Sequence, residues 1–110
     1  MNDDQIKLNQ RPIPEAALRD ENAVEMLRVW IAERGLHCSV KIGMYRETMN
    51  ISEEKAWGTI LADLAKHIAD ALQLKYSTDT AESLQKIRDG FVNELEKPTS
   101  DAKGGFVRKH

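Results

Sequence analysis

The stretch WGTILADLAKHIADAL, residues 57–72, carries the strongest periodic pattern in the chain. Its apolar residues recur at spacings of three and four, as they do on one face of an α-helix. Ser52 precedes the stretch as a helix cap, and Glu53 and Glu54 fall in the first turn, where the helix dipole favours acids. The pattern predicts one long amphipathic helix from Ser52 to about Leu74.

A further helix is predicted after this one, and a strand before it. Asp79 and Glu82 form a capping pair, and apolar residues then continue at helical spacing until Pro98. Before the long helix the period changes to two, which indicates a strand with one buried face. The apolar residues of that face are Leu36, Cys38, Val40, Ile42 and Met44.

Residues 22–34 show a third helical pattern. Asn22 and Glu25 have the spacing of a capping pair, and Gly35 is a typical residue after a helix end. The predicted order is therefore α-β-α-α, a mostly helical α+β fold with three helices and one principal strand or a small sheet. We expect an extended N-terminal arm over residues 1–15, a single α+β domain over 16–97 and a flexible tail over 98–110.

The single predicted strand needs a partner, because its backbone N–H and C=O groups require hydrogen bonds. The candidates are the segment QIKLN at residues 5–9, the segment TMNI at residues 48–51, and the same strand of a second copy. The third candidate predicts a symmetric homodimer.

Composition narrows the classes of function. The net charge of −2 lacks the basic excess typical of proteins that bind nucleic acid or anionic lipid, so neither partner is expected. No apolar run is long enough to span a membrane, and the polar N-terminus does not resemble a signal peptide, so the cytoplasm is the expected location. The one cysteine, Cys38, excludes an intramolecular disulfide. No cofactor is predicted.

One flank of the long helix carries a candidate site. Asp63, His67 and Asp70 are spaced by four and three residues and line one ridge, with His37 as a possible fourth ligand. Carboxylates and an imidazole can hold a divalent metal or perform acid–base chemistry. The simpler alternative is a solvated helix flank. Arg28 is expected to form a structural ion pair with Asp63.

The two tryptophans are the largest apolar anchors. Trp30 and Trp57 are expected in the core or in a dimer interface, where Ile42 and Met44 join them as candidates. The order strand, helix, helix also matches a ribbon-helix-helix DNA binder, whose paired strands enter the major groove. No convincing set of catalytic residues is present, so the pattern leans away from an enzyme.

The segments AVEMLRVWIA, GLHCSVKIG and AWGTILADLAKHIADAL together resemble a family of small, uncharacterised bacterial proteins known only as a domain of unknown function. The resemblance covers about Ala23 to Leu72. It implies a cytoplasmic bacterial protein with no established activity and assigns no catalytic residues. The leading hypothesis is a non-catalytic interaction or regulatory module working as a homodimer. A metal or acid–base site comes second, and DNA binding through the strand third.

Overall fold

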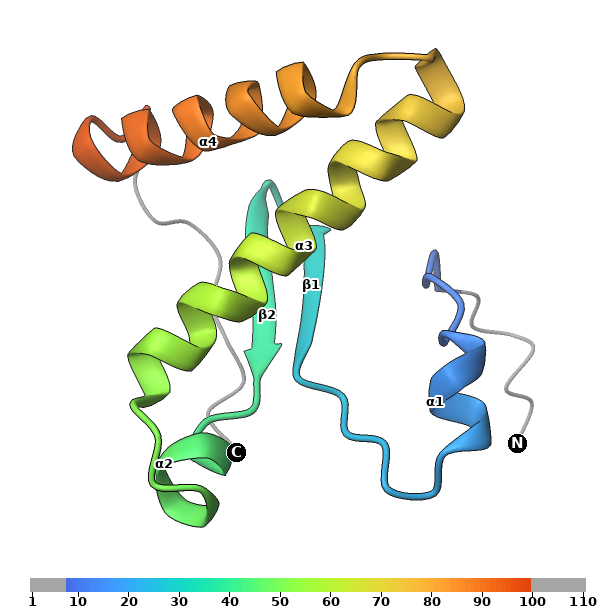
Figure 1. The fold of residues 1–110 in the computed structure, drawn as a ribbon, viewed down its shortest axis with the longest axis vertical. Helices are drawn as coiled ribbons and strands as arrows, with labels where there is room; N and C mark the ends of the chain where they lie inside the picture. The colour runs from blue at the N-terminus through green and yellow to red at the C-terminus, as the bar shows by residue number, and fades with distance from the viewer. Residues whose placement is uncertain (1–7, 100–110) are drawn as a thin grey trace.

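The structure, a computed structural model, describes residues 8–99, which form four helices and a two-stranded sheet (Figure 1). The mostly helical α+β class predicted from the sequence is confirmed. The elements in chain order are α1 (Glu15–Arg19), β1 (Leu27–Ala32), β2 (Gly35–Val40), α2 (Met44–Thr48), α3 (Glu53–Tyr76) and α4 (Thr80–Glu96).

The two long helices begin directly after the capping residues that the sequence analysis identified. The side chain of Ser52 accepts a hydrogen bond from the Lys55 amide at 3.2 Å, and Asp79 accepts one from the Glu82 amide at 3.0 Å. α3 ends at Tyr76, and the left-handed backbone of the next residue, Ser77, turns the chain back so that α4 packs against α3. The predictions for both helices are confirmed.

The helix predicted over residues 22–34 is wrong, because this segment contains β1. The chain turns at residues 20–23, where the Asp20 carboxylate accepts a hydrogen bond from the Asn22 amide at 2.9 Å. Leu27 and Ile31 are four residues apart, so they fit a helical face and a strand face equally well. Val29 lies between them and completes a period of two, in a run of β-branched and aromatic residues that favours a strand.

β1 and β2 form an antiparallel hairpin, which the sequence analysis did not predict. Trp30 pairs with His37, and the two loop residues, Glu33 and Arg34, have φ of 50° and 64°. Positive φ at both positions is what a type I′ hairpin turn requires. The strand partner is therefore none of the three candidates proposed above, and the strand gives no reason of its own for a second copy.

The predicted strand also ends earlier than its period suggested. β2 stops at Val40, α2 begins at Met44, and the candidate partner TMNI at residues 48–51 forms no strand. Gly43 precedes α2 with a φ of 108°, a conformation that favours glycine. Within the predicted N-terminal arm, residues 8–14 form no helix or strand, but residue 15 begins α1. Most of the predicted tail lies outside the described residues.

The described chain has almost no enclosed core. Ala56 and Ala69 are its buried hydrophobic residues, and no large side chain there is fully buried. No Cα atom of the hairpin strands lies within 8 Å of one in α3 or α4, although α3 runs obliquely in front of the hairpin in Figure 1. None of the described helices has the length and apolar character needed to cross a bilayer.

Candidate functional site

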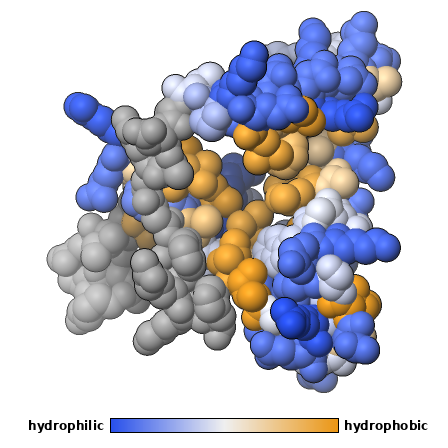
Figure 2. Space-filling model, turned by 90° about the vertical axis from the view of Figure 1, so that its left-hand side faces the viewer, coloured by the Kyte–Doolittle hydropathy of each residue, from blue (hydrophilic) through white to orange (hydrophobic). Residues whose placement is uncertain are grey.

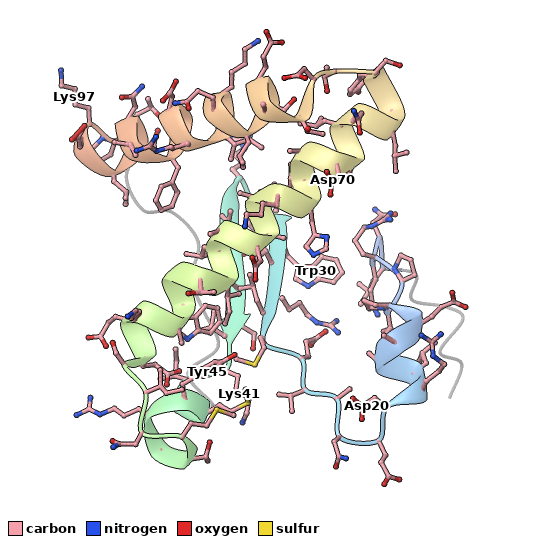
Figure 3. All side chains as sticks on the ribbon, viewed as in Figure 1. Asp20, Trp30, Lys41, Tyr45, Asp70 and Lys97 are labelled. Carbon is pink, nitrogen blue, oxygen red and sulfur yellow. The ribbon has the colours of Figure 1, made fainter. Side chains whose placement is uncertain are left out.

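The Asp63–His67–Asp70 ridge lies on the exposed side of α3. No hydrogen bond joins the three side chains, and Asp63 instead makes a loose ion pair with Lys66 at 3.9 Å. His37 lies on β2, whereas the three ridge residues lie on α3, where Figure 3 labels Asp70. Among residues 8–99, no group of three or more His, Cys, Asp or Glu side chains is arranged to hold a metal ion. The geometry therefore supports a solvated flank better than a metal centre.

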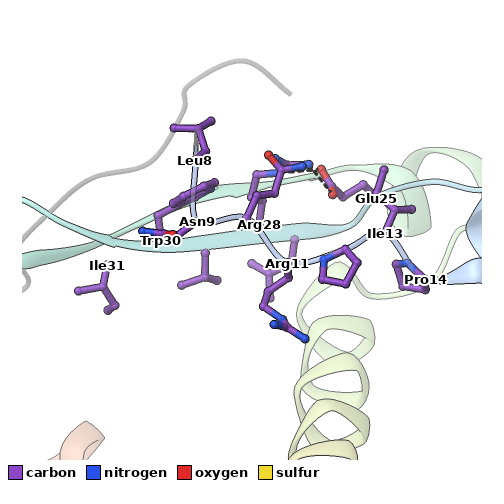
Figure 4. A pocket seen from close by; sticks show the side chains of 13 residues that line it. Leu8, Asn9, Arg11, Ile13, Pro14, Glu25, Arg28, Trp30 and Ile31 are labelled. Atoms are coloured by element: carbon purple, nitrogen blue, oxygen red, sulfur yellow. Dashed lines mark hydrogen bonds and ion pairs between the residues drawn. The ribbon is translucent and has the colours of Figure 1, made fainter. Parts of the chain in front are cut away.

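The predicted ion pair between Arg28 and Asp63 is wrong. The Arg28 guanidinium donates two hydrogen bonds to the Glu25 carboxylate, at 3.1 and 3.0 Å (Figure 4). This bidentate contact raises the pKa of Arg28. Arg28 follows Glu25 closely in the chain and lies on β1 instead of a helix that packs on α3, so the nearer acid is its partner.

The predicted interface residues come from β1, from α2 and the segment before it, and from α3. Trp30 is half-buried and projects from β1 toward the N-terminal segment, where residues 8–14 and β1 line an open cavity of about 600 Å³ (Figures 3 and 4). Trp57 is half-buried on α3, Met44 is half-buried at the start of α2, and Ile42 is 46% exposed. Trp57 and Gly43 donate hydrogen bonds to the same oxygen of Glu53, so Trp57 lies close to the segment that carries Ile42 and Met44, whereas Trp30 lies on β1.

Glu53 ties the start of α3 to α2. One carboxylate oxygen accepts hydrogen bonds from the Gly43 amide at 2.9 Å and the Trp57 indole at 3.2 Å. The other accepts from the amides of Tyr45 at 3.2 Å and Arg46 at 3.0 Å. These donors, the Gly43 and Arg46 amides foremost, lower the pKa of Glu53. These hydrogen bonds hold the start of α3 against α2.

An open apolar groove with a volume of about 510 Å³ lies between α3 and α4. We call it the α3–α4 groove. Figure 2 shows hydrophobic side chains gathered on the underside of α4 and in the hollow below it. The large apolar residues that line the groove are Leu61, Leu64, Ile68, Leu84, Ile87 and Phe91.

The groove is exposed to an extent unusual for such residues. Leu61, Leu64 and Ile68 are 40–42% exposed, and Phe91 is 53% exposed. Sequence analysis predicted the two amphipathic helices on which these residues lie. It could not show that the stripes of α3 and α4 leave a groove between them, because the angle between two helices is not encoded in either pattern alone.

The hairpin presents a second uncovered apolar face. Val29, Ile31 and Leu36 lie on the same side of the two strands and are 48%, 76% and 51% exposed. A sheet buries one face against another layer in a stable domain. Among residues 8–99, that layer is incomplete.

Fold and site together define a small α+β protein with an open apolar groove between its two long helices. The chain belongs to the family described as "Domain of unknown function (DUF5076)", whose model matches residues 10–99. This confirms the resemblance to an uncharacterised family found in the sequence.

One solved structure is similar over nearly the whole chain. It comes from the photosynthetic bacterium Rhodopseudomonas palustrus CGA009 and was provisionally named a pyruvate dehydrogenase. It is 25% identical in sequence, with a TM-score of 0.63, and the match covers 94% of this chain and 97% of that one. No protein with a curated description matches.

Proposed function

We propose that this protein is a non-catalytic, homodimeric interaction or regulatory module of the bacterial cytoplasm. The observation that carries the proposal is the size of its exposed surface. The accessible surface of the chain is 9983 Å², whereas a compact monomer of 12.5 kDa exposes about 6,200 Å². A chain with this much excess surface favours association.

The excess does not depend on the residues at the two ends. If the eighteen residues outside the described range are counted as fully exposed chain, about 1,600 Å² of excess still remains. A stable interface of standard size buries about 800 Å² on each partner. One chain therefore has more spare surface than a dimer needs, and much of it is apolar.

The alternative functions have less support. A metal site needs ligands brought together, and no group of three or more His, Cys, Asp or Glu side chains among residues 8–99 could hold an ion. A ribbon-helix-helix DNA binder pairs its strand with that of a second chain, whereas β2 already pairs with β1. The name of the structural neighbour suggests that the neighbour oxidises pyruvate. For this chain, the same activity would be supported by likeness of fold alone.

Light scattering at micromolar concentration tests the proposal. We expect a mass of twice the 12.5 kDa chain. A mass of one chain at every concentration would contradict the homodimer. A pyruvate-dependent reduction of an electron acceptor by the purified protein would contradict the non-catalytic role and favour the name of the neighbour.

A further inference from the structure

We propose that the α3–α4 groove is filled by the same groove of a second copy, across a twofold axis. This inference rests on the proposed homodimer and adds which surface forms it. Helices α3 and α4 of the two chains would then make a four-helix layer, with Phe91 of each chain inserted against α3 of the other.

The groove has the properties of a surface that pairs with itself. In a twofold dimer the same patch is used on both subunits, so the patch must supply both the projecting side chains and the spaces that receive them. Phe91 projects from α4 and is 53% exposed. Across the groove, α3 offers the small residues Gly58, Ala62 and Ala65. Phe91 on α4 and these small residues on α3 provide that complementarity.

Gly58, unlike Gly90, lines the groove and leaves room there for a close neighbour. It lies inside α3, where glycine is less favourable than alanine because it loses more backbone entropy. A Cβ atom added at Gly58 would meet nothing within 4 Å in the single chain. The absence of a side chain is therefore not required by this chain's own packing, whereas the approach of a second helix at the groove would require it.

The available area also favours a second copy over a short peptide. The excess surface of about 1,600 Å² per chain is twice what one partner buries in a standard interface. A groove of about 510 Å³ accounts for only part of this surface. A second copy covers the groove and the surface around it on both chains at once.

A charge placed in the groove tests the inference. Phe91→Glu should weaken self-association at least about thirtyfold, because it leaves a buried charge unpaired at the centre of the interface. Leu74→Glu is the matched control, since Leu74 is 88% exposed on α3 and does not line the groove. Its association constant should stay within about threefold of the native value. Sedimentation velocity over a range of concentrations measures both.

A second pair of variants keeps the test decisive if Phe91→Glu loses helical structure by circular dichroism. Gly58→Ala should weaken self-association about tenfold, because the added methyl group overpacks the groove contact. Gly90→Ala makes the same change in α4 at a position that does not line the groove, and it too meets nothing within 4 Å. It should leave association unchanged.

The outcomes separate this inference from the proposed function. A native protein that stays monomeric overturns both. A native dimer whose association is unaffected by Phe91→Glu and by Gly58→Ala overturns the groove contact and leaves the homodimer standing. Equal weakening by Leu74→Glu, or by Gly90→Ala, would also count against the groove.

Discussion

Glu53 shows how one side chain organises the start of the helical half of the molecule. Its carboxylate receives four hydrogen bonds from α2, Gly43 and Trp57. Because these donors stabilise the charged form, its pKa in the folded protein is lowered. The stabilisation is present when the pH is above the pKa of an unfolded glutamate, and it is lost as the pH falls through the lower pKa of the folded state.

Glu53→Gln should therefore lower the melting temperature at neutral pH by several degrees. Glutamine keeps one acceptor oxygen but directs an NH₂ group toward backbone amides, so two of the four hydrogen bonds are lost. Thermal melts between pH 7 and pH 3 should also show a smaller loss of stability on acidification than in the native protein.

Glu54→Gln is the control for this change, because Glu54 lies next to Glu53 and accepts no hydrogen bond from a described residue. Its melting temperature should fall less than that of Glu53→Gln at neutral pH, because it loses only the interaction of its charge with the helix dipole. If both variants behave alike, the tie to α2 contributes nothing to stability.

Sequence reasoning at this scale found residues but not their partners. Glu53 was recognised only as an acid in a first helical turn, since nothing in the pattern shows that the chain folds back from Gly43. Arg28 was given Asp63 as a partner because its segment was taken for a helix. Capping contacts were predicted correctly at Ser52 and Asp79, because they depend on residues only three positions apart.

At the scale of elements, the hairpin is the main difference between expectation and structure. Residues 27–35 satisfy two periods at once, and the two-residue turn lacks the Asn-Gly sequence that usually identifies a hairpin. The long stripes of α3 and α4 have no such ambiguity, because they extend over several helical turns. Their extent was predictable for that reason.

The turn predicts a stabilising change. Glu33→Asn combined with Arg34→Gly should raise the free energy of unfolding by about 1 kcal/mol per residue, because both positions have positive φ, which these replacements tolerate better. Urea denaturation followed by circular dichroism measures the effect. The sign discriminates between the two structures, since glycine within a helix over residues 22–34 would instead destabilise it by about 1 kcal/mol.

At the scale of the whole molecule, the described chain is open. Its radius of gyration is 16.5 Å, compared with about 13 Å for a compact chain of this length. Two apolar surfaces, the α3–α4 groove and one face of the hairpin, remain largely uncovered. No sequence pattern could show this, because amphipathic stripes look the same whether they face the same chain or another one.

This openness predicts that stability depends on protein concentration. If folding and dimerisation are coupled, each tenfold increase in concentration stabilises the dimer by about 1.4 kcal/mol. For a dimer of two chains of this length, the melting temperature should then rise by about 3–5 °C for each tenfold increase. Scanning calorimetry from 5 to 500 µM, roughly two such steps, measures the rise.

The Phe91→Glu variant provides the comparison for this measurement. If the α3–α4 groove forms the dimer, the variant should melt at a lower temperature that no longer changes with concentration, whereas Leu74→Glu should keep the native slope. Unfolding must be reversible for the slope to report an equilibrium, which a second scan of each sample checks. A native melting temperature that stays constant across this range would show that one open chain is stable alone. The exposed apolar surface would then have to be available to a different partner.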